Sequence, residues 1–322
     1  MMKKIHPVLT AAMCLFLLTG EAHASEALIP VGQVVGLELR NNSVSIAAFD
    51  DALGAAARQA GLQIGDEILD IDGKKVDQAA DVRQALTHSD GRVRMTVLRK
   101  EKEHQLSLTP QVTPAGPRLG VYLRQGVTGI GTVTWYDPET GRFGTLGHGV
   151  NDANGKPVEL TEGTAYEANV LSVKRGKCGE PGQLRGGVNT GHVLGTVEKN
   201  TPQGVFGTIQ AGWTGDTFET ASRAQVKTGP AIIRSTVNGK APREYSVEIQ
   251  KIYPGNRPEG RNMLIKVTDP DLLNATGGIV QGMSGSPIIQ DGKLVGAVTH
   301  VLVNDPTMGY GIFIENMLDA AS

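Results

Sequence analysis

The sequence predicts a mostly β protein of two domains. Glycine accounts for 42 of the 322 residues, well above its usual share of roughly 7 %, and aromatic residues make up only 4 %. Frequent Val and Thr runs between glycines are typical of short strands joined by tight turns. A chain of 322 residues is long for a single hydrophobic core. The formal net charge of −2 provides no basic field for nucleic acid or an anionic membrane surface.

The N-terminus has the pattern of an export signal. A lysine pair precedes an apolar run from Val8 to Gly20, and Ala22-His23-Ala24 follows as a small-x-small cleavage pattern. The apolar run is shorter than the ~20 residues that a membrane-spanning helix needs. We therefore expect residues 1–24 to be a signal peptide, or else an N-terminal membrane anchor.

A single cysteine, Cys178, lies downstream of this segment. An internal disulfide is therefore impossible in the exported chain, although an oxidising compartment would permit one. Lysine and arginine residues flank it in the chain, as they do near some reactive cysteines. We nevertheless interpret Cys178 as a loop residue rather than a nucleophile.

Residues 28–109 form the first predicted domain. A short helix ends at Gly61, a second helix is expected over Gln78–Thr87, and strands are expected at Arg92–Leu98 and His104–Leu108. The order resembles a PDZ domain. The matching residues are Ala60-Gly61-Leu62, Gly65-Asp66, Ile68, Ile71 and Asp72-Gly73.

PDZ domains bind an extended peptide as an added strand between a strand edge and a helix. The resemblance implies that backbone amides near Gln33–Leu37 hold the carboxylate of the peptide, with Val35, Gly36 and Leu37 as peptide-binding residues. The strand would be Leu37–Arg40 and the helix Gln78–Thr87. The alternative is a compact adaptor that fixes orientation and binds nothing.

A linker is expected at residues 110–117, where proline, threonine and glycine concentrate. Residues 118–322 then form a second domain rich in glycine, strands and turns.

The second domain contains a candidate nucleophile in Gly282-Met283-Ser284-Gly285. A serine hydroxyl needs a neighbouring base that takes its proton, and donors directed at the oxyanion formed on the substrate. Glycines permit a tight turn in which N–H groups point the same way. The N–H groups of Gly282 and Ser284 are the candidate oxyanion hole. The α/β-hydrolase pattern Gly-x-Ser-x-Gly is not met, because Gly285 follows Ser284 directly.

The residues after Ser284 predict a hairpin and a further strand. Ile288–Gln290 and Leu294–Val298 flank the turn Asp291-Gly292, and Gly309–Ile314 follows as a glycine-lined strand. This order is typical of the nucleophile loop and pocket wall in a chymotrypsin-like second barrel. The predicted fold is thus mostly β, with a PDZ domain (α+β) followed by a chymotrypsin-like double β-barrel serine peptidase domain.

The candidate base is His148, which lies between two glycines after the expected strand Phe143–Leu146. This position is poor for core packing and good for reaching into a cleft. His192 is a weaker candidate, and His300 could line the pocket.

Two aspartates could orient the imidazole. Asp216 lies between the histidine and the serine in the chain, and Asp269 lies shortly before Ser284. Spacing alone slightly favours Asp216.

Four segments closely resemble the stage IV sporulation protein B peptidases. They are "FGTLGHGV", "KVTDPDLL", "GGIVQGMSGSPIIQ" and "GAVTHVLVNDPTMGYGIFIE". The resemblance implies an exported serine endopeptidase with a PDZ domain and catalytic residues His148, Asp269 and Ser284. It further implies cleavage of a membrane-associated regulatory protein in the forespore intermembrane space, which triggers intramembrane processing of a precursor sigma factor during sporulation.

The expected partners are a protein substrate and a peptide tail at the PDZ groove, with no nucleic acid. No cofactor or metal is expected, because the remaining histidines and carboxylates show no ligand spacing. Two alternatives stay open. One is an envelope quality-control protease with a PDZ domain, although such enzymes often place the peptidase first. The other is a non-catalytic PDZ scaffold with a degenerate peptidase fold.

Overall fold

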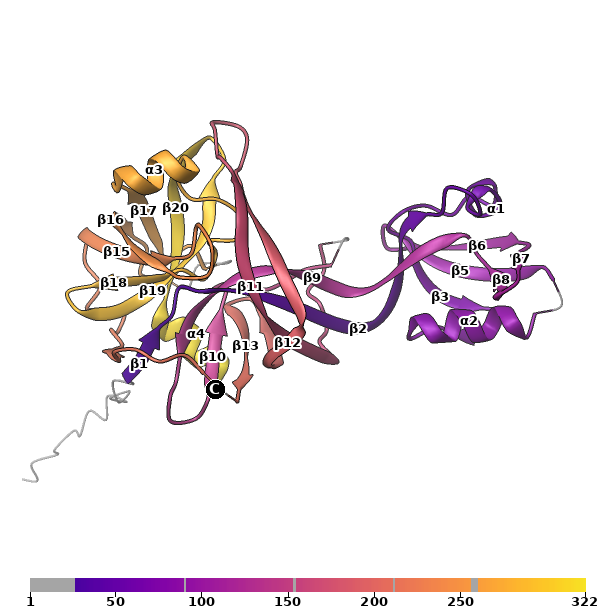
Figure 1. The fold of residues 1–322 in the computed structure, drawn as a ribbon, viewed down its shortest axis with the longest axis horizontal. Helices are drawn as coiled ribbons and strands as arrows, with labels where there is room; N and C mark the ends of the chain where they lie inside the picture. Colours follow the sequence, from indigo (N-terminus) through magenta and orange to yellow (C-terminus); the bar gives the residue numbers. More distant parts are fainter. Residues whose placement is uncertain (1–26, 90, 153–154, 211, 256–259) are drawn as a thin grey trace, which may run out of the picture.

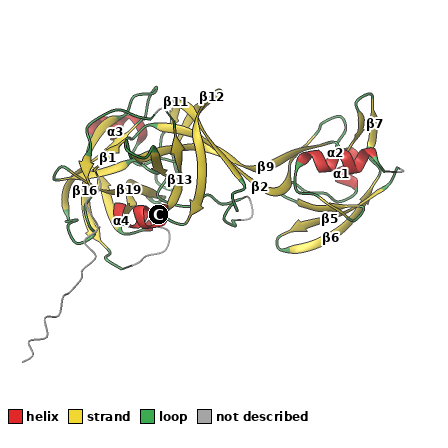
Figure 2. Ribbon diagram, turned by 90° about the horizontal axis from the view of Figure 1, so that it is seen from below, coloured by secondary structure: helices red, strands yellow, loops and turns green. Residues whose placement is uncertain are grey.

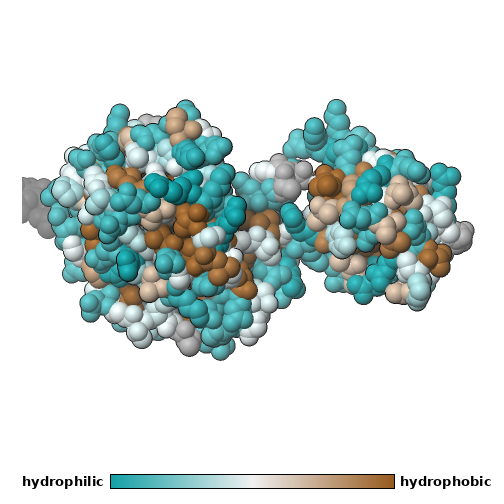
Figure 3. All heavy atoms as spheres, turned by 45° about the horizontal axis from the view of Figure 1, so that its top comes forward, coloured by the Kyte–Doolittle hydropathy of each residue, from teal (hydrophilic) through white to brown (hydrophobic). Residues whose placement is uncertain are grey.

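The computed structural model describes residues 27–89, 91–152, 155–210, 212–255 and 260–322. The expected signal segment, residues 1–24, lies outside these ranges. Figure 1 shows a large body and a small body joined by two strands, β2 (Val34–Phe49) and β9 (Val121–Tyr136). The space-filling view shows the same two bodies (Figure 3). Among the helices of the described ranges, none has the length and apolarity to span a bilayer.

The first barrel of the large body is a closed ring of six strands. In ring order these are β9, β10 (Arg142–Thr145), β13 (Gly204–Ile209), β12 (Gln183–Thr201), β11 (Glu162–Lys174) and β2, which pairs back with β9. Alternate residues Val35, Leu37 and Leu39 of β2 are at most 5 % exposed, as a half-buried strand requires.

The second barrel is also a closed ring of six strands. Its strands are β15 (Gly229–Ser235), β16 (Arg243–Ile252), β17 (Met263–Val267), β20 (Asp305–Phe313), β19 (Lys293–Leu302) and β18 (Pro287–Gln290). Buried Ile233, Val247 and Ile265 fill its interior. Two packed six-stranded barrels confirm the predicted chymotrypsin-like fold.

Four short elements accompany the barrels of the large body. They are the strands β1 (Ala27–Pro30) and β14 (Phe218–Glu219) and the helices α3 (Pro270–Thr276) and α4 (Ile314–Ala321). Figure 2 shows the two helices, α3 and α4, on different sides of the large body. The buried face of α4 packs Ile314 and Met317 against Trp135 and Phe206 of the first barrel. The C-terminal helix therefore ties the two barrels together.

The small body is the PDZ domain. Its elements are α1 (Ala55–Gln59), β3 (Glu67–Ile71), β4 (Lys74–Lys75), α2 (Ala79–Thr87), β5 (Val93–Arg99) and β6 (Lys102–Leu108). The second predicted helix is α2, and its first turn is closed by a capping box between Gln78 and Asp81. Arg99 pairs with the buried Asp66 at 2.6 Å and fixes the turn before β3.

The PDZ domain is inserted into the first barrel rather than placed before it. Residues 35–39 of β2 pair with both β9 and β11 in the barrel, whereas Val44–Phe49 of the same strand pairs with Val121–Gln125 in the small body. The expected boundary at residue 28 therefore differs from the structure. The expected linker, residues 110–117, instead contains a small hairpin of β7 (Gln111–Thr113) and β8 (Gly116–Arg118).

The insertion corrects the expected peptide-binding residues. Val35 pairs with Gly131 on one side and Glu167 on the other, Gly36 with Ile130 and Tyr166, and Leu37 with Gly129 and Ala165. Because both edges are occupied inside the barrel, Val35, Gly36 and Leu37 cannot accept an added strand.

An unpaired edge lies instead at the start of β9. Val121–Gln125 pairs with β2 along one edge, and within the described residues no strand pairs with the other. Helix α2 packs beside β8 and the start of β9. The unpaired edge of Val121–Gln125 and the helix α2 together have the arrangement in which PDZ domains bind a peptide.

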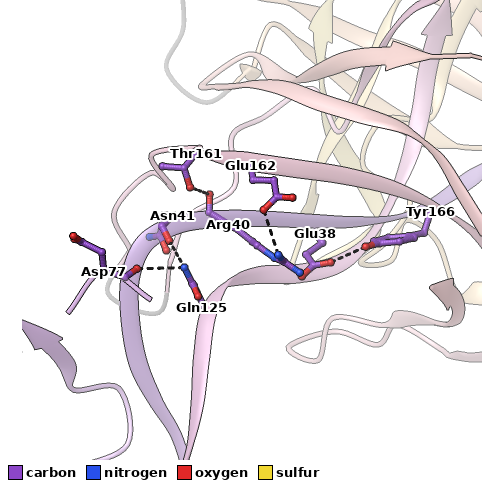
Figure 4. Close-up of polar contacts among 8 residues, drawn as sticks. All are labelled: Glu38, Arg40, Asn41, Asp77, Gln125, Thr161, Glu162 and Tyr166. Carbon is purple, nitrogen blue, oxygen red and sulfur yellow. Dashed lines mark hydrogen bonds and ion pairs between the residues drawn. The ribbon is translucent and has the colours of Figure 1, made fainter. Parts of the chain in front are cut away.

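Polar contacts hold the two-stranded ribbon of β2 and β9 where it enters the PDZ domain (Figure 4). The amide Nε2 of Gln125 donates to the carbonyl oxygens of Asn41 and Asp77 at 3.1 and 3.3 Å. Arg40 bridges Glu38 and Glu162, and Tyr166 donates to Glu38 at 2.9 Å. The junction is therefore bonded on both its PDZ side and its barrel side.

Candidate active site

Ser284 lies on a turn between the two barrels. Gly282 and Gly285 flank it with φ of 97° and 96°, in the left-handed region that favours glycine. A Cβ on Gly285 would lie 1.9 Å from the carbonyl oxygen of Thr132, so any side chain there would collide with β9. The glycines thus allow the serine turn to pack directly on the first barrel.

Two buried threonines of β9 hold the serine turn. The hydroxyl of Thr132 donates to the carbonyl of Gly282 at 2.8 Å, and that of Thr134 donates to the carbonyl of Gly285 at 2.7 Å. The N–H of Thr132 also donates to the carbonyl of Ser284 at 3.1 Å. Thr132 and Thr134 were not predicted from the sequence, because threonine is common in strands and reveals nothing of its contacts there.

Along the serine turn, N–H groups that donate to the protein alternate with N–H groups that do not. Those of Met283 and Gly285 donate to the carbonyls of Val280 and Val298. Within the described chain, the N–H groups of Gly282 and Ser284 donate to no protein acceptor. These two predicted oxyanion donors are therefore available to a substrate oxygen.

His148 lies at the end of a turn that follows β10. Leu146 and Gly147 both have φ of 69°, and Leu146 is a rare non-glycine residue in this region. The double left-handed turn takes the chain out of β10, so that the following histidine lines the cleft of Ser284.

The tautomer of His148 follows from its hydrogen bond. Nδ1 lies 2.8 Å from the carbonyl oxygen of Gly149. Because a carbonyl oxygen can only accept, Nδ1 carries the hydrogen and Nε2 keeps its lone pair. Burial lowers the pKa of His148 below its usual value, since it disfavours the charged ring. His148 is therefore a neutral base with Nε2 available.

Ser284 and His148 line one cleft of about 420 Å³. The other walls are mainly apolar and include Ile130, Ile279 and Val280. The hydroxyl of Ser284 donates to the carbonyl of Thr299 at 2.7 Å. Proton transfer to His148 thus requires the hydroxyl to turn away from Thr299, as is common in enzymes without bound substrate.

His300 also lines the cleft, as the sequence had allowed. Its ring centroid lies 5.2 Å from that of His148. The pair also borders a neighbouring cavity of about 400 Å³ that includes Asn200 and Pro202. His192 lies apart from both, exposed on β12 with Nδ1 at 3.3 Å from Glu167.

Asp269 does not lie in the cleft with His148. Its side chain caps α3, accepting the N–H of Leu272 at 3.0 Å and the N–H of Ser246 at 3.2 Å. Both carboxylate oxygens are thus engaged by backbone donors. In this structure Asp269 is a helix cap, and the resemblance to a catalytic acid is not reflected in its contacts.

Asp216 does not reach His148 either. It lies exposed in the loop before β14, outside the residues that line the cleft. In the described part of the chain, the orienting partner of His148 is the carbonyl of Gly149 rather than a carboxylate. Over the same residues, no three His, Cys, Asp or Glu side chains lie close enough to hold a metal ion.

Comparisons with known proteins identify a peptidase family and a domain family in this chain. The sequence model of the family described as SpoIVB peptidase S55 matches residues 116–318, which is more than half of the chain. A PDZ domain model matches residues 52–99. A comparison with curated proteins gives no match.

Among solved structures, the chain is similar to the active form of the Rv3671c protease from M. tuberculosis. The two share 16 % identity over 62 % of this chain and 75 % of the other, with a TM-score of 0.36.

Proposed function

Because the chain belongs to the SpoIVB peptidase S55 family and is a serine peptidase with a PDZ domain, we propose that Ser284 is its nucleophile and His148 its general base. The main support is one cleft that is lined by Ser284, His148 and Gly282, with the N–H groups of Gly282 and Ser284 left without a protein acceptor in the described residues. These are the parts that acyl transfer requires.

In the proposed reaction, Nε2 of His148 takes the proton of Ser284 as Oγ attacks the scissile carbonyl. The N–H groups of Gly282 and Ser284 stabilise the oxyanion. His148 then protonates the leaving amine, and water hydrolyses the acyl-enzyme with His148 again as base. The carbonyl of Gly149 keeps the hydrogen on Nδ1 throughout.

Cleavage of a denatured protein tests these roles. Ser284→Ala should abolish cleavage of denatured casein. Ser286→Ala is the matched control, because Ser286 is buried with its hydroxyl bonded to Ser235 at 2.9 Å. We expect it to retain cleavage. Equal loss in both variants, each confirmed to be folded, would contradict the assignment of Ser284.

We further propose that the substrate is a membrane-associated regulator and that its cleavage triggers processing of a precursor sigma factor during sporulation. The proposed location is outside the cytoplasmic membrane, in the forespore intermembrane space, with the protein either released or tethered. Family membership and the export-type N-terminus support this proposal.

Replacing the gene with a Ser284→Ala copy in the spore-forming organism tests the biological role. The precursor sigma factor should then remain unprocessed, as followed by immunoblotting. Normal processing in that strain, with the variant protein present at its usual level, would contradict the proposed role and leave the peptidase assignment intact.

A further inference from the structure

One edge of β9 is unpaired from the PDZ domain to the active site. From Val121 to Thr132 the strand pairs with β2 on one side only. Its other edge is first paired at Val133, by β10. Over the described residues no strand covers the edge between these points. The stretch ends at Thr132, whose N–H donates to the carbonyl of Ser284 at 3.1 Å.

A cavity of about 520 Å³ borders the middle of this stretch. It lies between Thr128–Ile130 of β9 and the start of β12, where Leu184 and Val188 form part of its wall. Ile130 lines both this cavity and the Ser284 cleft. The N–H of Leu184 also donates to the carbonyl of Gln281, three residues before Ser284, at 2.8 Å.

We propose that a C-terminal tail of the protein substrate lies along this edge of β9, and that the strand thereby sets the distance from the tail end to the cut. The proposal rests on the peptidase function of Ser284. An exposed strand edge offers main-chain donors and acceptors to an added strand. The apolar cavity would take side chains from the middle of the tail.

The direction of the tail follows from where a PDZ domain holds the carboxylate of its peptide. PDZ domains hold the peptide carboxylate with backbone amides beside the groove strand. Here that strand begins at Val121, directly after Gly120, which has φ of 72°, and the exposed Arg118 lies nearby. With its carboxylate there, the tail runs antiparallel to β9, and its upstream residues reach Ser284.

The length of the tail follows from strand geometry. An extended peptide advances about 3.3 Å per residue, the same step as the strand it pairs with. The stretch Val121–Thr132 therefore matches a tail of about 12 residues. Cleavage is expected on the N-terminal side of such a tail.

The residues that line the cavity indicate which side chains the tail should carry. Its wall is mainly apolar at Leu37, Ile130, Leu184 and Val188, and its charged lining residues are Glu38 and the exposed Arg185. A tail with apolar residues in its middle and a free carboxylate at its end fits these surfaces. A uniformly charged tail would leave the apolar wall unmatched.

A peptide library with free or amidated C-termini tests the proposal. The full chain is incubated with each library, and the cut positions are read by mass spectrometry. We expect cuts in the free library to concentrate about 12 residues before the C-terminus, and this concentration to disappear on amidation. Cuts spread evenly with respect to the C-terminus, or unaffected by amidation, would overturn the proposal.

A matched pair of variants on β12 tests the cavity. Val188→Arg should disperse the cut positions and lower kcat/KM for free-tail peptides about ten-fold. Val193→Arg is the control, since Val193 is 57 % exposed and lies outside the cavity lining. An unchanged cut pattern in Val188→Arg would overturn the proposal.

Labelling by a fluorophosphonate separates this proposal from the function of Ser284. It should proceed at the wild-type rate in both variants, because neither residue lines the Ser284 cleft. Failure of folded wild type to label would contradict the peptidase itself. Labelling with no tail dependence of cleavage would contradict the tail alone.

Discussion

At the residue scale, the site depends on a histidine that is held by its own backbone neighbour. The carbonyl of Gly149 holds Nδ1 of His148 and leaves Nε2 with its lone pair, as the proposed base requires. A carboxylate in this position would favour the charged ring and raise its pKa, whereas burial lowers the pKa of His148. The neutral, base-competent form of His148 therefore persists to lower pH than in a free histidine.

The pH dependence of kcat/KM tests this environment. Activity should be lost as pH falls through the pKa of His148, because protonated Nε2 cannot act as a base. Since burial lowers that pKa, the acid limb should lie below the free value of about 6.5. An acid limb above this value would contradict a desolvated, half-buried base without a carboxylate partner. His192→Gln is the control and should leave the limb in place, since His192 is exposed on β12.

Replacing Asp269 separates a helix cap from a catalytic acid. Asn retains a side-chain acceptor at the N-cap and should keep both stability and turnover near wild type. Ala removes the acceptor for Leu272 N–H and should lower the free energy of unfolding by about 1 kcal/mol. Chemical denaturation and turnover are measured for both variants. A catalytic acid would instead lose roughly 10⁴-fold in kcat on change to Asn.

At the element scale, β9 supports the turn of the proposed nucleophile, Ser284, from the opposite barrel. Thr132 and Thr134 are buried polar residues, and each hydroxyl donates to a glycine carbonyl of the serine turn. The sequence predicted the turn, because its glycines and serine are adjacent in the chain. It could not predict the support, because the contact joins residues about 150 positions apart.

Thr132→Val tests the support from β9. The substitution keeps the shape of the side chain and leaves the half-buried carbonyl of Gly282 without its donor, at a cost of about 1 kcal/mol. We expect fluorophosphonate labelling to slow by roughly ten- to a hundred-fold through displacement of the oxyanion donors. The acid limb of kcat/KM should not move. Thr196→Val, on the exposed side of β12, should label normally. Normal labelling in both would show that the turn needs no such support.

At the scale of the whole molecule, a PDZ domain interrupts the first barrel. Local patterns correctly predicted a PDZ domain, a serine peptidase domain and the second PDZ helix. The resemblance to PDZ domains implied a peptide edge at Val35–Leu37, which is wrong because a barrel strand pairs with these residues on each side. Only the pairing partners of β2 reveal that this one strand belongs to both the barrel and the PDZ domain.

Gln125 connects the ribbon to the start of α2, and its replacement tests this connection. Gln125→Ala removes the hydrogen bonds to the carbonyls of Asn41 and Asp77. We expect faster amide hydrogen exchange at residues 40–43 of β2 and at the start of α2, because fewer hydrogen bonds then have to break for these segments to open locally. Gln105→Ala, an exposed change on β6, is the control. Equal exchange in both variants would contradict a fixed junction.

The most direct test of the central claim is the site and rate of fluorophosphonate labelling in the full chain. Peptide mapping should find the adduct on Ser284 in the folded wild type. His148→Ala should slow its formation by roughly a hundred-fold or more, because Oγ then lacks its base. An adduct on another serine, no adduct on folded wild type, or an unchanged rate in His148→Ala would contradict the account.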